Sequence, residues 1–332
     1  MLAEGRGTRP SGDGSEVAAV GASRTLALWG FLFAVASAAS FALSGIFASA
    51  LLSAGWSAGA AATARIVLAA LILAAPTAIA LRGRWHLVRA AWRPILLFGL
   101  LAVVGAQLAF FLAVQFILPS LALLIEFTGP VLLMLWTWLR TRVAPSVVTL
   151  LGAALALLGL AVISGVVTGD GLHPLGIAFA LVAAIGVAAY YATGAMGDHG
   201  IPPLPFVGLG LAVGAVVLIL VSATGMLPFV ITDAPAVVAG VVASPWLLVT
   251  GMVLISTVLS YVLGVAASRR LGATVASFTG YSEPLFGVLW TAVLLSVLPT
   301  PLQWLGAALI VAGVVTVKAG ELLRARRRIA AR

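Results

Sequence analysis

The sequence predicts an all-α integral membrane protein whose ten transmembrane helices form two inverted repeats of five. Three observations support this prediction: an apolar composition, an internal repeat and a one-sided distribution of positive charge. Of the 332 residues, 63% are hydrophobic and 8% are charged, and the mean hydropathy is +1.22. Soluble chains carry about a quarter charged residues, so little of this sequence is left for a water-soluble domain.

The apolar residues form continuous runs of about 20 residues, which is long enough to cross the hydrocarbon of a bilayer. We expect spans at 27–50, 57–81, 95–114, 119–139, 146–167, 174–196, 203–223, 245–267, 271–297 and 301–320. These runs lack the period-two alternation of β-barrel strands, which argues against a barrel.

The spans divide the chain into four parts. We expect a disordered cytoplasmic tail at 1–26, a first five-helix repeat at 27–167, a second at 174–320 and a basic cytoplasmic tail at 321–332. The first tail is rich in Gly, Ser and charge, which is typical of disorder.

One stretch of the first half recurs in the second without a gap. Pro130 recurs as Pro284, 154 residues later, and Trp136 recurs as Trp290 at the same offset. Apolar composition alone would align scattered Leu and Ala residues, but not prolines and a tryptophan. An internal duplication in a membrane protein favours a transporter. Because five is odd, two copies of five spans would face opposite ways in the bilayer.

Positive charge is confined to alternate loops. Of the 18 Lys and Arg residues, all but Arg65 lie outside the predicted spans or at their ends. The loops at 51–56, 115–118, 168–173, 224–244 and 298–300 contain none. The positive-inside rule then places both termini in the cytoplasm. The basic loops suit anionic lipid headgroups, and no soluble basic face is left for nucleic acid.

Three charged residues lie inside predicted spans: Arg65, Glu126 and Glu283. Each costs about 2.5–3.5 kcal/mol to insert at the centre of a bilayer, so each needs a reason to be there. Arg65 and Glu126 are expected at similar depth, so a direct ion pair between them is geometrically open. One interpretation is a salt bridge that only fixes helix packing. The other is a site where Arg65 holds a substrate carboxylate and Glu126 takes an amine or a proton.

Both acids lie beside a proline and small residues, which favours helices that line a polar cavity. The residues predicted to kink these helices or line the cavity are Gly129, Pro130, Gly280 and Pro284. The alternative is a pair of kinked packing helices whose acids are kept protonated.

Larger uncharged polar side chains complete the predicted site, because each needs a hydrogen-bond partner inside the membrane. The full predicted substrate-binding set is Arg65, Gln107, Glu126, Tyr190, Tyr261 and Glu283. Intramembrane Ser and Thr residues are more simply explained by helix packing.

Several motifs are missing from the sequence. There is no phosphate-binding G-x-x-x-x-G-K-[ST] loop, no hydrolase or metalloprotease motif and no cysteine, and all three His residues fall in expected loops. We therefore predict no enzyme activity, no metal and no cofactor.

The stretch LALLIEFTGPVLLMLWTWL at 121–139 and its counterpart within 256–290 resemble the EamA family of the drug/metabolite transporter superfamily. EFTGP at 126–130 is similar to the bacterial threonine/homoserine exporter branch. The resemblance covers about 27–320. It implies a ten-helix inverted-repeat carrier in the bacterial plasma (inner) membrane, with a central cavity that exports amino acids or related metabolites, often against protons. It also implies a structural role for Arg65, since TARIVLAAL at 63–71 resembles a common family position.

The two halves depart from each other at the acids. Glu126 aligns with Gly280, and Glu283 aligns with Gly129, so a symmetric two-acid mechanism is not expected. The leading hypothesis is a secondary transporter of amino acids or related small metabolites that works by alternating access. Its expected partners are a small-molecule substrate and the lipid bilayer, with proton coupling left open. The alternatives are a channel or lipid scramblase, and a non-transporting membrane scaffold.

Overall fold

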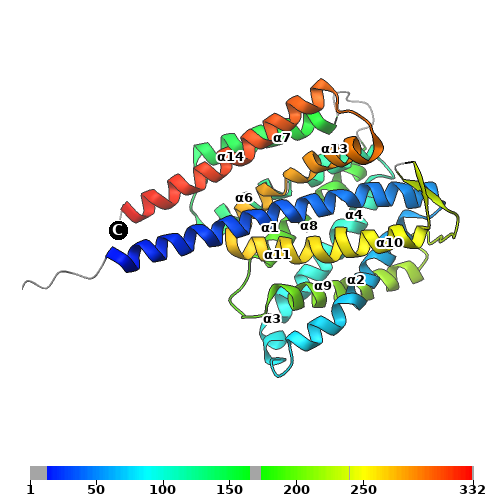
Figure 1. Cartoon of the computed structure of the whole chain (residues 1–332), viewed down its shortest axis with the longest axis horizontal. Coiled ribbons are helices and arrows are strands. Elements are labelled where there is room, and N and C mark those ends of the chain that lie inside the picture. The colour runs from blue at the N-terminus through cyan, green and yellow to red at the C-terminus, as the bar shows by residue number, and fades with distance from the viewer. Residues whose placement is uncertain (1–12, 165–172, 239, 331–332) are drawn as a thin grey trace, which may run out of the picture.

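The computed structural model describes residues 13–164, 173–238 and 240–330 (Figure 1). The first half comprises α1 (Asp13–Ser53), α2 (Ala58–Ala80), α3 (His86–Leu97), the π-helical segment η1 (Phe98–Gly105), α4 (Ala106–Ala113), α5 (Pro119–Glu126), α6 (Gly129–Thr141) and α7 (Val147–Ser164). The second half comprises α8 (Pro174–Gly194), α9 (Pro203–Ala223), the antiparallel hairpin of β1 (Ala236–Val238) and β2 (Val241–Ala243), α10 (Pro245–Val253), the π-helical η2 (Leu254–Leu259), α11 (Ser260–Leu271), α12 (Ala273–Thr279), α13 (Ser282–Leu295) and α14 (Pro301–Ala330).

Within the described residues, nine helical segments are long and apolar enough to cross a membrane. They correspond to the predicted spans except at 271–297, where α12 ends at Thr279 and α13 begins at Ser282. The expectation of ten continuous spans is therefore not confirmed. The break between α12 and α13 has a physical reason in Pro284, which has no N–H to donate to the carbonyl of Gly280. That carbonyl instead accepts the backbone N–H of Glu283 at 2.9 Å, in a tighter turn.

The first half is interrupted at the corresponding place, between α5 and α6. Pro130 is the second residue of α6, a position where a helix tolerates proline because its N–H would be unpaired anyway. Before it, the N–H of Thr128 donates to the carbonyl of Ile125 at 2.9 Å. The two prolines thus lie in the first turns of new helices, where the sequence alone predicted kinks in continuous ones.

The sequence repeat is also a structural repeat. Arg142 and Ser296, at equivalent positions, both end a helix in the left-handed conformation with φ 56°. Thr137 and Thr291, also equivalent, each donate a hydroxyl hydrogen bond of 2.8 Å to the carbonyl four residues earlier. η1 and η2 likewise end at equivalent residues. The duplicated sequence therefore folds twice into the same local structure.

The last helices of the two halves, α7 and α14, cross at glycines. A Cβ added to Gly152 would lie 2.8 Å from the carbonyl oxygen of Gly313, and one added to Gly306 would lie 2.7 Å from that of Gly159. The contacts run in opposite directions along the two helices, so α7 and α14 are antiparallel. Because Gly306 is the repeat of Gly152 and Gly313 that of Gly159, the two contacts are equivalent. Such reciprocal contacts are typical of a two-fold relation.

The halves also interdigitate elsewhere. Helix α1 packs against α11 and α13 of the second half, whereas α8, the first helix of the second half, packs against α4 and α6 of the first. The two second helices, α2 and α9, pack on each other. Each half thus inserts its first helix into the other, and the space between them is lined by both.

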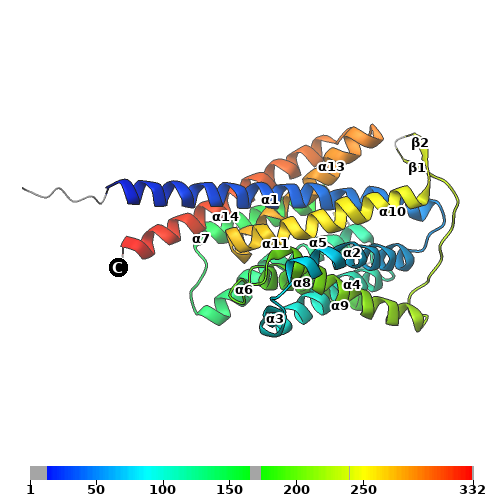
Figure 2. The same ribbon diagram turned by 60° about the horizontal axis from the view of Figure 1, so that its bottom comes forward.

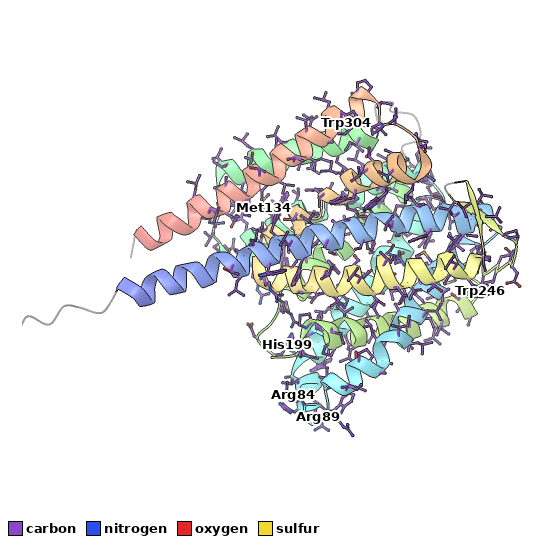
Figure 3. All side chains as sticks on the ribbon, in the orientation of Figure 1. Arg84, Arg89, Met134, His199, Trp246 and Trp304 are labelled. Atoms are coloured by element: carbon purple, nitrogen blue, oxygen red, sulfur yellow. The ribbon has the colours of Figure 1, made fainter. Side chains whose placement is uncertain are left out.

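The molecule has two distinct ends. Figure 2 shows the start of α1 and the end of α14 at one end and the β1–β2 hairpin at the other. In Figure 3, Arg84 and Arg89 lie at the bottom of the molecule, away from Trp246 and Trp304. We call the end with the two termini the basic end. The end with the hairpin is the neutral end, because its loops at 54–57, 114–118, 224–244 and 296–300 contain no Lys or Arg.

Helix α1 begins at Asp13, so residues 13–26 are helical where the sequence predicted a disordered tail; residues 1–12 lie outside the described residues. Extending an existing helix needs no new nucleation, which allows even a Gly- and Ser-containing segment to continue it. Helix α14 similarly runs to Ala330, through most of the predicted basic tail.

Candidate functional site

A cavity of about 680 Å³ lies between the two halves. All six predicted substrate-binding residues line it: Arg65, Gln107, Glu126, Tyr190, Tyr261 and Glu283. Pro130, Gly280 and Pro284 line it as well. Gly129 is outside this lining, because it faces α8, where an added Cβ would lie 2.7 Å from the carbonyl oxygen of Ala184.

Arg65 reaches the cavity from α2 and is only 5% exposed. Its Nη1 donates to the hydroxyl of Ser44 at 3.1 Å, and its guanidinium lies 5.7 Å from the ring centre of Phe41. Its buried Nε has no hydrogen-bond partner within the described structure. No ion pair among the described residues joins Arg65 to Glu126 or Glu283. The direct Arg65–Glu126 salt bridge that we considered is therefore wrong, because α1 supplies the nearer partners.

The two acids stand at the two helix breaks. Glu126 is the last residue of α5, and Glu283 lies in the first turn of α13, where the helix N-terminus favours negative charge. Both line the same cavity as Arg65. The cavity therefore brings one cation and two carboxyl groups together without pairing them.

The halves are chemically unequal at these breaks. Gly280 occupies the position equivalent to Glu126, and a Cβ on Gly280 would collide with the hydroxyl of Tyr191. The second half thus presents a phenol at the place where the first half presents a carboxyl group. The inequality predicted from the aligned sequences has this structural counterpart.

Aromatic rings form one wall of the cavity. The ring centres of Tyr190 and Tyr261 are 5.5 Å apart, and Phe98 lies 5.5 Å from Tyr190. The hydroxyl of Tyr190 lies against Gly264, where a Cβ would collide with it. Gln107 and Tyr261, at equivalent positions, each follow a π-helical segment. Such segments often mark functional sites, but the apolar sequences of η1 and η2 contain no signal that would have predicted them.

Sequence reasoning also missed Tyr281, which is fully buried between the two helix breaks. Its hydroxyl donates to the backbone carbonyl of Phe127 at 2.6 Å, and the two rings lie 6.0 Å apart. These residues occupy equivalent positions in the two repeats. The 154-residue offset was therefore a signal that could have found the pair.

Direct contacts join α1 and α11 on the basic-end side of the cavity. The hydroxyl of Ser37 on α1 donates to the carbonyl of Ser260 on α11 at 2.8 Å, and the hydroxyl of Ser260 donates back to the carbonyl of Ser37 at 3.1 Å. Further along α1, the guanidinium of Arg270 lies 4.8 Å from the ring centre of Phe33. These contacts hold α1 and α11 together on this side of the cavity, whose lining includes Ala34 and Ala267.

Toward the neutral end the cavity continues to the ends of the helices. Its lining there includes Leu52 at the end of α1, Ala58 at the start of α2, and Pro299 and Gln303 around the start of α14. The lining therefore reaches the helix ends on the neutral side, whereas α1 and α11 are in contact on the basic-end side.

Comparisons with known proteins agree with this architecture. The EamA-like transporter family matches residues 28–165 and 174–318, once in each half. The uncharacterized inner membrane transporter YicL of Salmonella typhimurium is 26% identical over 237 residues, covering 70% of this chain and 75% of the relative. A crystal structure with 19% sequence identity superposes with a TM-score of 0.68 over 88% of this chain and 97% of that one, which shows the fold. The more specific similarity to threonine/homoserine exporters is not confirmed. The chain, a multi-pass membrane protein, belongs to the EamA-like transporter family.

Proposed function

We propose that the protein is a secondary transporter that exports amino acids and related small zwitterions by alternating access, with protons as the coupling ion. The observation that carries the proposal is the cavity that gathers Arg65, Glu126 and Glu283 without an ion pair between the cation and either acid. The family and the transporter relative support transport as the general activity.

The arrangement of charges suits a zwitterion. A carboxylate of the substrate can accept hydrogen bonds from Arg65, whose guanidinium is hydrogen-bonded only to Ser44 within the described residues, and guanidinium groups favour such planar pairing. The substrate amine can then lie at Glu126 or Glu283. One arginine cannot offset two carboxylates, so the acid left over would be ionised at high cost in the membrane. That acid is the proposed proton carrier.

The antiparallel crossing of α7 and α14 supports an inverted arrangement of the two halves. A two-fold axis that exchanges two antiparallel helices is perpendicular to both of them, so it would lie in the plane of the membrane. In the proposed topology α12 and α13 together complete the tenth crossing, which leaves five crossings in each half. Rocking of one half against the other would break the Ser37–Ser260 contacts and open the cavity at the basic end. The positive-inside rule places that end in the cytoplasm.

Flux in proteoliposomes tests the proposal. With a panel of radiolabelled amino acids, we expect saturable flux that a pH gradient can drive uphill. Glu126→Gln and Glu283→Gln should each reduce the flux at least tenfold, because a hydrogen bond to a buried charge contributes about 1.5–3 kcal/mol. Glu321→Gln is the matched control, since Glu321 lies on α14 outside the cavity and pairs with Arg324 at 3.9 Å.

The same assay separates the alternatives. A channel or scramblase would give flux that neither saturates nor runs uphill, and a scaffold would give none. If the double variant Glu126→Gln/Glu283→Gln kept the wild-type flux and pH dependence, the proposed site would be wrong.

A further inference from the structure

A second cavity, of about 440 Å³, lies beside the central one. We call it the side groove; it lies between α1, α13 and the β1–β2 hairpin, and its lining includes Gly45, Ser49, Val237, Gly287, Thr291 and Leu295. None of the described residues that line it is charged. Gly45 and Ser49 are exposed on the surface of α1, so the groove opens on the outer face of an apolar membrane-spanning helix.

Only a thin seam separates the side groove from the central cavity. Ala42 and Gly45 of α1, together with Gly287 and Thr291 of α13, line both cavities. On the basic-end side of this seam the indole N–H of Trp290 donates to the carbonyl of Ala39 at 2.8 Å. Helix α13 has no buried residue in the described structure. Helix α13 is therefore only partly buried, although it packs along α1 and is hydrogen-bonded to it through Trp290.

The two glycines of the seam have no packing or backbone reason to be glycine. Gly45 and Gly287 lie inside helices without a positive φ, and in the described structure an added Cβ on either would meet nothing within 4 Å. By contrast, the helical glycines Gly152 and Gly306 allow close contact between backbones. Glycine weakens a helix relative to alanine. What the two seam glycines provide is clearance between the cavities.

The seam lies next to the charged residues of the central cavity. Glu283 and Gly287 are four residues apart on α13 and so share one helix face, at a separation of roughly 6 Å along the axis. On α1, Gly45 directly follows Ser44, the hydrogen-bond partner of Arg65. A ligand whose charged head lies at Arg65 and Glu283 therefore has the seam one helical turn away.

We propose that the seam is a lateral portal and that the site binds single-chain amphiphiles. The zwitterionic head lies at Arg65 and Glu283, and the unbranched apolar chain passes between Gly45 and Gly287 into the side groove. An uncharged groove that opens toward lipid suits a hydrocarbon chain, because the chain is never transferred to water. This inference rests on the proposed function and adds to it the class of substrate.

A homologous series tests the portal. Linear 2-amino acids from 2-aminohexanoate to 2-aminododecanoate share one head and differ only in chain length. The Kd of each homologue is measured in lipid nanodiscs and corrected for its partition into protein-free nanodiscs. We expect this Kd to fall about fourfold for each added methylene, which corresponds to about 0.8 kcal/mol per buried CH₂. Gly45→Leu and Gly287→Leu should flatten this dependence, because a leucine side chain fills the seam. Leucine is a better helix former than glycine, so both variants should fold.

Two matched controls accompany these variants. Gly197→Leu places the same side chain at another glycine with open space, in the loop between α8 and α9, and Val293→Leu enlarges an exposed residue of α13 outside both cavities. Both should keep the wild-type dependence on chain length. Unchanged dependence in the two seam variants would overturn the portal.

The outcomes also separate the portal from the proposed function. If short homologues bind and are transported but longer ones gain no affinity, the portal is wrong and the transporter stands. If no homologue of any length binds, the proposed substrate class fails together with the portal. In a third case the groove would hold only membrane lipid. A dye attached to Ser49→Cys, in a chain without native cysteine, detects this case, because brominated lipids in the groove quench its fluorescence. If the long homologues do not relieve that quenching, they do not displace the lipid, and the proposal is overturned.

Discussion

At the scale of single residues, Arg65 shows what decides the role of a charge in a membrane. A guanidinium that is 5% exposed is costly to bury unless its donors find partners. Ser44 and Phe41 stabilise it without neutralising it. Its charge therefore acts on the cavity, together with the two nearby acids, and Ser44 is the only hydrogen-bond acceptor of its guanidinium within the described residues.

Replacing Arg65 by lysine tests this interpretation. Arg65→Lys keeps the charge but removes the planar set of donors that can hold Ser44 and a carboxylate at once. We expect amino-acid counterflow in proteoliposomes to fall at least tenfold. Arg324→Lys, a substitution of the same kind at the partly exposed Arg324–Glu321 pair, should leave counterflow unchanged. Equal counterflow for both variants would contradict a donor role for Arg65.

His199, in the loop between α8 and α9, makes stability depend on pH. Its ring stacks on Phe206 at 5.9 Å and its Nδ1 accepts the N–H of Ile201 at 3.4 Å. Burial, followed by the positive charge of Arg269, lowers the pKa of His199 below its usual 6.5. The unfolded chain therefore binds this proton more readily than the folded protein, and stability is lost as pH falls below 6.5.

We expect the thermal midpoint in detergent to fall between pH 7 and pH 5.5. His199→Phe keeps the stacking on Phe206 and removes the titration, so it should make that fall smaller. His86→Phe, in which the changed residue begins α3, is the control and should follow the wild type. An identical pH dependence in His199→Phe would show that another group is responsible.

At the scale of elements, two paired helix breaks organise the site. Each places an acid at a helix end, with a proline in the first turn of the next helix. A broken helix exposes backbone groups that must be satisfied inside the membrane. Tyr281 satisfies one of them, because its hydroxyl binds the carbonyl of Phe127 at the other break. The breaks are therefore coupled through equivalent positions of the repeat.

Removing that hydroxyl should loosen both breaks. Tyr281→Phe keeps the ring contact with Phe127 and leaves a buried carbonyl without its donor. We expect a loss of about 1 kcal/mol in the free energy of unfolding, seen as a lower thermal midpoint in detergent. Phe127→Leu, which keeps the carbonyl and changes the ring, separates the two contributions. An unchanged midpoint in Tyr281→Phe would mean that another group satisfies this carbonyl.

At the scale of the whole molecule, duplication explains why the cavity lies where it does. Each half inserts its first helix against the other half, so the space between them is lined by both. In the described conformation α1 and α11 are in contact on the basic-end side, whereas the cavity lining reaches Pro299 and Gln303 at the neutral end. The two ends of the cavity therefore differ, although the two halves that line it are similar.

The topology can be measured with single cysteines, because the chain has none. Leu298 is 83% exposed and lies in the loop before α14 at the neutral end, whereas Arg84 lies at the basic end. The two test variants are Leu298→Cys and Arg84→Cys. A membrane-impermeant maleimide should label the first in intact cells and the second only after permeabilisation. The unsubstituted chain is the control. Labelling of both from the same side would overturn the inverted arrangement.

The sequence by itself determined the membrane class, the extent of most helices, the duplication and six of the polar residues that line the cavity. It could do so because these properties depend on local composition and on periodic patterns. The break at 280–281 was only partly predictable: Gly280 and Pro284 indicated a disturbance there, but not that the helix would end.

Only the tertiary structure decided the partners. The depth of Arg65 along its helix suggested Glu126, yet the side chain binds Ser44 because α1 lies nearer. The π-helical segments, the Tyr281–Phe127 bond and the open seam at Gly45 and Gly287 likewise depend on how helices cross. A helical sequence specifies which residues share a face, but the neighbour of that face is chosen by the packing of the whole chain.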